Sequence, residues 1–338
     1  MSRSAKLAAG ILLLGAGVAA LLLLREQGPA APARAFEFTY TARVPALPEG
    51  SEKLRLWIPV PESDAHQDIT SLRLESPVPY ELHRDPLYRN LYAYLEVDPK
   101  EVPTPFELKL RLWVTRRENK VAMEPAAAGS GADASPAELE RALAPDRLVP
   151  TDGLIAQLAA QETRGLTDPL DKARAVYRYV VSTMKYDKSG EGWGRGDAIY
   201  ACNIRKGNCT DFHALFIGMM RASGVPARFE IGFPLPADKP AGEIPGYHCW
   251  AQFYVEGIGW IPVDASEAWK NPDKRDYFFG AHDQNRVLFS RGRDIRFNPA
   301  QEGEPLNYFI YPYAEVDGKP FDGVQAQFLF RDLDLPTR

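Results

Sequence analysis

Apolar and polar residues alternate with a period of two along four segments in the first third of the chain. This period is typical of strands that bury one face. Proline-rich stretches separate the segments, and short strands with such turn signals favour an antiparallel sandwich. We therefore expect a β-sandwich module over residues 36–121, built from segments 36–44, 53–58, 91–97 and 106–114.

A helical period replaces this alternation further along the chain. Residues 122–150 begin with a run of small residues, which is typical of a linker. Beyond it, apolar residues recur on one helical face, which predicts a helix in a core of residues 151–285. Alternation returns after residue 286, so we expect a C-terminal β extension of that core over residues 286–338. The helical face comprises Ala173, Val176, Tyr177, Val180 and Met184.

The N-terminus contains an apolar run, Leu7–Leu24, without a single charge. As a helix, such a run would rise about 27 Å, close to the ~30 Å hydrocarbon core of a bilayer. Arg3 and Lys6 precede the run, which favours an N-inside orientation. We expect residues 1–30 to be an inner-membrane signal anchor, with membrane contact through residues 7–24. The rest would then be exported to the periplasm or cell exterior. A cleaved signal peptide, which would give a secreted protein, is the alternative.

Composition narrows the class of protein. The 338 residues are 45% hydrophobic and 25% charged, which excludes a disordered chain and a polytopic membrane protein. A net charge of -5 argues against a nucleic-acid partner. Three cysteines are too few for a disulfide scaffold. One hypothesis from their odd number and the expected export is that Cys202 pairs with Cys249 and leaves Cys209 free.

Cys209 stands at the predicted start of a helix. Gly207 precedes it, apolar residues follow at helical spacing, and Gly224 with Pro226 closes the helix. The positive end of a helix favours a thiolate, which is the nucleophilic form of cysteine. Backbone N–H groups there lack intrahelical partners and can donate to an oxyanion. These features make Cys209 a candidate nucleophile, while a buried structural cysteine is the alternative.

His248 and Asp264 are the candidate partners of Cys209. His248 begins a strand-like segment, and Asp264 ends the strand that follows directly. A loop of five residues, 255–259, pairs Tyr254 with Trp260. It makes the histidine and the aspartate diagonal neighbours on one face. A carboxylate there would fix the imidazole tautomer. With an even register, Glu267 would be the rival partner.

These pieces together resemble the transglutaminase-like superfamily, a branch of the papain-like cysteine acyl-transfer enzymes. The resemblance covers about residues 170–270 and rests on four stretches of sequence. The first two are Gly207-x-Cys209-x-Asp211-Phe and the helix ending in Gly-Val-Pro-Ala-Arg228. The others are Tyr247-His248-x-Trp250 and Gly259-Trp-x-Pro-Val-Asp264.

The resemblance implies an α+β fold in which a papain/transglutaminase-like core follows the β-sandwich module. It implies Cys209 as nucleophile, His248 as general base and acid, and Asp264 as the residue that orients the imidazole. The implied substrate is an amide of a protein or peptide. A peptidase or amidase and a cross-linking transglutaminase would share this site. No cofactor and no metal are expected.

Other roles near Cys209 stay open. Tyr200, Trp193 and Asn203 are candidates for a second oxyanion donor, and residues 189–196 read as a glycine-rich loop that borders a groove. His213 is an alternative base, four residues after Cys209.

Two other classes of protein are alternatives to a thiol enzyme. One is a zinc protein, which is disfavoured because the sequence has no Cys-x-x-Cys pair. The other is a non-catalytic scaffold or binding protein of the cell envelope.

Overall fold

The computed structural model describes residues 31–102, 104–124 and 134–335. The described residues from Ala33 onward belong to one compact unit. Within these ranges, no helix combines the length and the apolar character that crossing a membrane requires. The apolar run Leu7–Leu24, on which the anchor prediction rests, lies outside the described residues.

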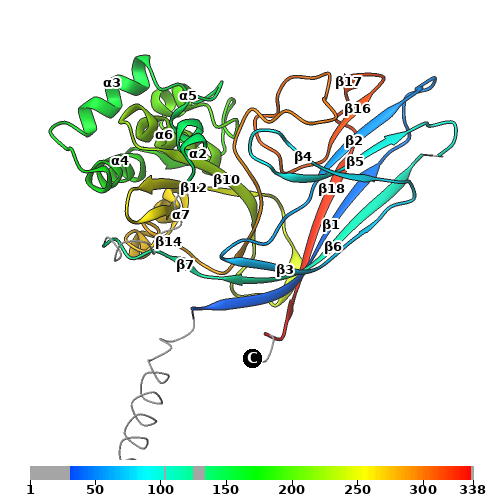
Figure 1. Ribbon diagram of the computed structural model, residues 1–338, viewed down its shortest axis with the longest axis horizontal. Coiled ribbons are helices and arrows are strands. Elements are labelled where there is room, and N and C mark those ends of the chain that lie inside the picture. Colours follow the sequence, from blue (N-terminus) through cyan, green and yellow to red (C-terminus); the bar gives the residue numbers. More distant parts are fainter. Residues whose placement is uncertain (1–30, 103, 125–133, 336–338) are drawn as a thin grey trace, which may run out of the picture. The chain divides into compact units, whose positions relative to one another are not determined.

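Two five-stranded sheets form the β-rich part of the molecule (Figure 1). The first has the order β11 (Ala241–Glu243), β18 (Gln325–Leu333), β1 (Ala33–Val44), β6 (Phe106–Arg117), β3 (Gln67–Glu75). The second has the order β17 (Lys319–Pro320), β16 (Tyr313–Val316), β2 (Leu54–Pro59), β5 (Leu91–Val97), β4 (Glu81–Arg84).

Alternation along the strands explains why the two sheets pack together. In β1, Phe36, Phe38 and Tyr40 are buried, whereas Glu37 and Thr39 between them are partly exposed. The inward residues of β1, β2, β5 and β6 belong to one hydrophobic cluster. The second sheet is also covered on its other face, where Trp57, Tyr92 and Tyr94 cluster with Phe297 and Phe309. The period of two predicted the four strands correctly, and the antiparallel sandwich is confirmed.

The C-terminal strands complete this sandwich. β15 (Arg286–Arg291) pairs with the core sheet, as an extension of the core would. β16 and β17 join the second sheet through a turn at Asp317–Gly318, and β18 pairs along β1 in the first. Phe328 and Phe330 of β18 are buried, and the Phe328 ring lies 4.9 Å from that of Tyr40. Because β18 has an apolar face to bury, this last strand joins the sandwich whose first strand is β1.

The remaining elements form a helical layer on a four-stranded sheet. The sheet has the order β13 (Gly259–Val263), β12 (His248–Val255), β10 (Ala227–Pro234), β15. The helices are α2 (Pro136–Leu143), α3 (Gly153–Glu162), α4 (Pro169–Thr183), α5 (Ala198–Ile204), α6 (Cys209–Ala222) and α7 (Ala265–Lys270). Short elements are β7 (Asn119–Lys120) with β14 (Ala281–His282), β8 (Lys185–Tyr186) with β9 (Lys206–Gly207), and η1 (Pro272–Lys274).

Helix α6 is the central helix of this layer. Every residue from Cys209 to Arg221 is buried, and α6 packs on β12 while α3, α4 and α5 contact it from other sides. The predicted apolar face of α4 is buried as well. The α+β class is thereby confirmed, and its central helix begins at the candidate nucleophile.

Candidate active site

The first turn of α6 presents Cys209. Asn208 is the N-cap, and its side-chain oxygen accepts the backbone N–H of Thr210 at 2.9 Å. Asp211 completes a capping box by accepting the N–H of Asn208 at 2.9 Å. The cap fixes the start of the helix at the cysteine, so the partial positive charge of the helix end acts on its sulfur.

The hairpin of β12 and β13 brings His248 to Asp264. Tyr254 pairs with Trp260 and Val255 with Gly259, which is the register expected from the five-residue loop. As a result, His248 Nε2 lies 2.7 Å from Asp264 Oδ2. Glu267 bonds Lys270 instead, so the rival partner is not used by the imidazole.

Asp264 is buried and fully hydrogen-bonded. Its Oδ1 accepts the N–H of Glu267 at 3.0 Å and the hydroxyl of Ser266 at 3.1 Å, while Arg286 Nη1 lies 3.2 Å from Oδ2. Burial alone would raise the pKa of Asp264, but the positive charges of His248 and Arg286 hold it well below its usual range. The carboxylate is therefore a fixed negative charge behind the imidazole.

The Cys209 thiol and the His248 imidazole shift each other's pKa. Cys209 is 3% exposed and His248 is 4% exposed. Burial opposes ionisation of both, yet hydrogen bonds from Cys249 and His248 and the charge on the imidazole hold the pKa of Cys209 well below its usual range. Asp264 and Cys209 overcome the burial of His248 and raise its pKa to about 10. The arrangement favours a thiolate beside an imidazolium at neutral pH.

His213 occupies the next turn of α6 and is engaged on both ring nitrogens. Its Nδ1 lies 2.8 Å from Cys209 O, and its Nε2 accepts the backbone N–H of Ala265 at 3.1 Å. A donor at Nδ1 and an acceptor at Nε2 define a neutral ring, and burial lowers the pKa of His213. The geometry thus gives His213 a structural role and does not support His213 as an alternative base.

Asp211 anchors the glycine-rich loop of residues 189–196. Its buried carboxylate accepts the backbone N–H groups of Gly194 at 2.7 Å and Gly196 at 3.0 Å, besides that of Asn208. The loop expected to border a groove is therefore tied to the helix that carries Cys209. The sequence motif contained Asp211, but only the fold shows which amides it binds.

We expect Asp211→Ala to lower the free energy of unfolding by about 3 kcal/mol, because three backbone N–H groups, two of them buried and that of Gly194 partly buried, would lose their acceptor. Urea unfolding measures this loss. Asp197→Ala is the matched control: Asp197 only caps α5 through the N–H groups of Ile199 and Tyr200, and its loss should cost about 1 kcal/mol. Equal losses in the two variants would contradict the role given to Asp211.

The three oxyanion candidates lie in different settings. Trp193 already donates its indole N–H to Gly190 O at 3.1 Å. The Tyr200 hydroxyl is buried without a partner, and Asn203 is exposed on α5. The second oxyanion donor stays a prediction.

Sequence reasoning missed a chain of polar groups beside the nucleophile. Asn208 Nδ2 donates to the Tyr247 hydroxyl at 3.1 Å, and that oxygen lies 3.5 Å from the hydroxyl of Tyr308. Tyr308 in turn donates to Gly194 O at 3.2 Å. The position of Tyr247 directly before His248 was the available signal, whereas nothing in the sequence links Tyr308 to either residue.

The three cysteines are all free, so the proposed pairing of Cys202 with Cys249 is wrong. The Cys249 thiol points to α6 and lies 3.7 Å from His213 Nδ1, while Cys202 lies on α5. Among the described residues, no group of three or more His, Cys, Asp or Glu side chains could hold a metal ion.

Comparisons with known proteins identify the domain that carries these residues. Residues 156–265 match the model of the transglutaminase-like superfamily, so the chain carries a transglutaminase-like domain. That span includes Cys209, His248 and Asp264. The family resemblance and the transglutaminase-like α+β fold are confirmed.

Relatives extend the similarity beyond the domain. An uncharacterised protein of Haemophilus influenzae is 29% identical over 337 residues, covering 86% of this chain and 88% of that protein. The uncharacterised YebA of Bacillus subtilis is 24% identical over 132 residues, covering 35% of this chain and 18% of YebA. A crystal structure from Cytophaga hutchinsonii, described as a "putative cysteine protease", has a TM-score of 0.61 at 16% identity and covers 92% of this chain and 94% of that one. That structure shares the fold.

Proposed function

We propose that this protein is an exported thiol enzyme that acts on amide bonds of proteins or peptides through a thioester on Cys209. One observation carries the proposal: a buried thiol at a helix start has its pKa lowered by an imidazole whose Nε2 lies 2.7 Å from a buried carboxylate. Burying a charged pair costs free energy unless its charges are well compensated. A non-catalytic scaffold would have no use for such a pair, whereas a thiol enzyme uses it in its reaction.

The geometry supports a two-step reaction. The Cys209 thiolate attacks the amide carbonyl carbon, and the oxyanion can accept the N–H of Cys209, which has no intrahelical partner. The tetrahedral intermediate collapses as His248 Nδ1 gives its proton to the amide nitrogen. The C–N bond then breaks, the amine departs, and a thioester remains on Cys209. His248 then takes a proton from water or a second amine, which attacks the thioester and releases the Cys209 thiolate.

The test is turnover of dye-labelled peptide and protein amides, with and without a labelled primary amine, by the wild type and by Cys209→Ala. We expect the variant to lose all turnover above background because no other group can form the thioester. Cys202→Ala is the matched control and should retain activity, since Cys202 lies on α5. Incorporated amine would mark a transamidase, and hydrolysis alone a peptidase or amidase. Equal turnover by wild type and Cys209→Ala would leave the scaffold as the remaining function.

Export is proposed from the apolar run Leu7–Leu24 and the basic residues before it. We expect the full-length protein to sediment with membranes, to resist carbonate extraction and to retain Met1. Protease added outside spheroplasts should digest the part that follows residue 30. A soluble protein that lacks the first thirty residues would instead indicate a cleaved signal peptide.

A further inference from the structure

A cavity of about 260 Å³ lies apart from Cys209, where strands of the sandwich meet the core sheet. Residues of β10 and β12 line it from the sheet face opposite α6, because Gln252 lines the cavity while its neighbour Phe253 contacts Phe216 of α6. The charged residues that line it are Arg116, Arg228, Arg291, Asp64 and Glu230.

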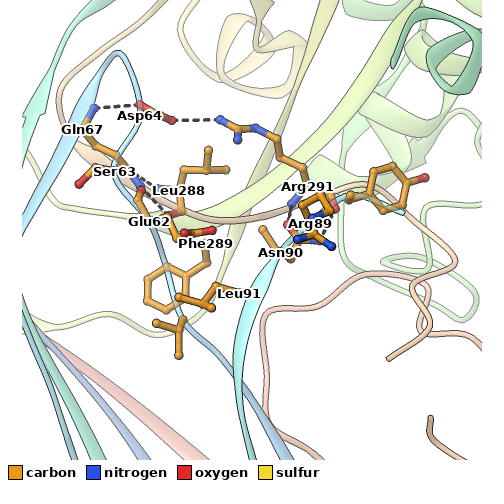
Figure 2. Close-up of a pocket in the computed structure, with 13 residues that line it drawn as sticks. Glu62, Ser63, Asp64, Gln67, Arg89, Asn90, Leu91, Leu288, Phe289 and Arg291 are labelled. Carbon is orange, nitrogen blue, oxygen red and sulfur yellow. Dashed lines mark hydrogen bonds and ion pairs between the residues drawn. The ribbon is translucent and has the colours of Figure 1, made fainter. Parts of the chain in front are cut away.

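Both carboxylates of this cavity are already engaged. Glu230 binds Arg291 Nε at 2.8 Å and Trp250 Nε1 at 2.7 Å. Asp64 binds Arg291 Nη2 at 3.0 Å, and its other oxygen accepts the backbone N–H of Gln67 at 2.9 Å. Figure 2 shows Asp64 between Gln67 and Arg291 in the neighbouring pocket that shares these residues. Arg228 is paired with Glu138 outside the cavity at 2.5 Å, so of the three guanidinium groups only Arg116 lacks a carboxylate at hydrogen-bond distance.

Arg116 carries the uncompensated charge. Its side chain is 3% exposed, and its contacts are long: 3.4 Å from Nη1 to Gln67 Oε1 and 3.9 Å to Asp64 Oδ1. Its Nε has no partner, and neither has Oδ1 of Asn119 in the same cavity. Burial lowers the pKa of Arg116 to about 10.

Other buried arginines show that this fold can satisfy a guanidinium. Arg293 is 1% exposed and donates to Gly196 O at 2.7 Å and to Arg195 O at 3.1 Å. Arg221 binds Asp146 at 2.6 Å and Ala227 O at 2.9 Å. The Nε atoms of Arg141 and Arg286 lack a partner too, but each of these guanidinium groups binds an aspartate at hydrogen-bond distance through another nitrogen. Arg116 has no such carboxylate, and since a buried polar group without a partner is costly, its free Nε indicates a missing acceptor.

We propose that this cavity binds the carboxylate of a small monoanionic ligand, which accepts the Nε–H of Arg116. A guanidinium edge matches a carboxylate in geometry, and Arg116 is the one guanidinium of the cavity without a carboxylate at hydrogen-bond distance, which matches a single negative charge on the ligand. A water molecule occupies about 30 Å³ in the liquid, so the cavity has room for a molecule of amino-acid size. The proposal does not depend on the reaction at Cys209.

Acetate and N-acetylglycine titrated into the full-length protein test the site. The unfolding midpoint and calorimetric heat are followed at fixed ionic strength against sodium chloride, with inorganic phosphate as a second anion. We expect a saturable rise in Tm with both carboxylates and weaker binding of phosphate. Arg116→Gln should weaken acetate binding at least tenfold, because a hydrogen bond to a charged group is lost. Arg117→Gln is the matched control, since Arg117 pairs with Asp68 at 2.7 Å.

Arg116→Lys is a second variant that keeps the buried charge and removes the Nε–H; we expect the same loss of acetate affinity. The proposal is overturned if the wild type shows no saturable response, which would mean that water alone fills the cavity. It is also overturned if both Arg116 variants bind acetate like the wild type. Phosphate binding tighter than acetate would replace the monoanionic carboxylate with a phosphate ligand.

Discussion

Asp264→Asn is expected to lower kcat/KM by about 10³- to 10⁴-fold while leaving the fold intact. The introduced asparagine would keep the shape of the side chain but present an amide that can hold the wrong tautomer of His248, and this loss in a comparable triad has that size. The negative charge that raises the pKa of His248 would also be absent. Steady-state kinetics on an amide substrate measure the effect, and circular dichroism checks the fold.

Asp283→Asn is the matched control for this substitution. Asp283 also lies near Arg286, at 3.5 Å, but has no contact with the imidazole. Its replacement should leave kcat/KM within a few-fold of the wild type. Equal losses from the two variants would mean that the charge on Arg286, rather than the orientation of His248, limits the reaction.

Local patterns were enough to predict where the three candidate catalytic residues lie in the fold. Helical spacing after Cys209 located α6, and the parity of the β12–β13 loop placed Asp264 on the same face as His248. Both inferences concern residues that are close in the chain, where the period of the backbone fixes which side chains share a face.

Contacts between distant segments could not be predicted in this way. Arg286 reaches Asp264 from a different strand, and β18 pairs with β1 although it lies about 290 residues further along the chain. Alternation shows that β18 has a face to bury but does not say which sheet receives it. The same limit hid the cavity around Arg116, since its lining comes from strands that are adjacent only after folding.

The largest effect on the nucleophile itself is expected from His248→Gln. In the wild type, the pKa of Cys209 lies well below its usual range, so iodoacetamide should alkylate it at pH values at which an ordinary thiol is protonated. Without the imidazolium, only the hydrogen bonds from Cys249 oppose the effect of burial, so the pKa of the thiol should rise toward the ordinary value of about 8.5. A thiol with that pKa is less than about 1% ionised at pH 6, so alkylation of the variant there should be strongly slowed.

Mass spectrometry of the Cys209 peptide across pH 5–10 measures this change in rate. The wild-type rate should level off at a lower pH than the variant's, because a thiol with a lowered pKa ionises at lower pH, whereas the variant's rate should rise about tenfold per pH unit until it approaches its own pKa. His213→Gln is the control: His213 is neutral and binds the carbonyl oxygen of Cys209 rather than its sulfur, so its loss should leave alkylation at pH 6 within a few-fold. If His213→Gln suppressed alkylation and His248→Gln did not, the charge that holds the thiolate would reside on α6, and the base of the reaction would have to be reassigned.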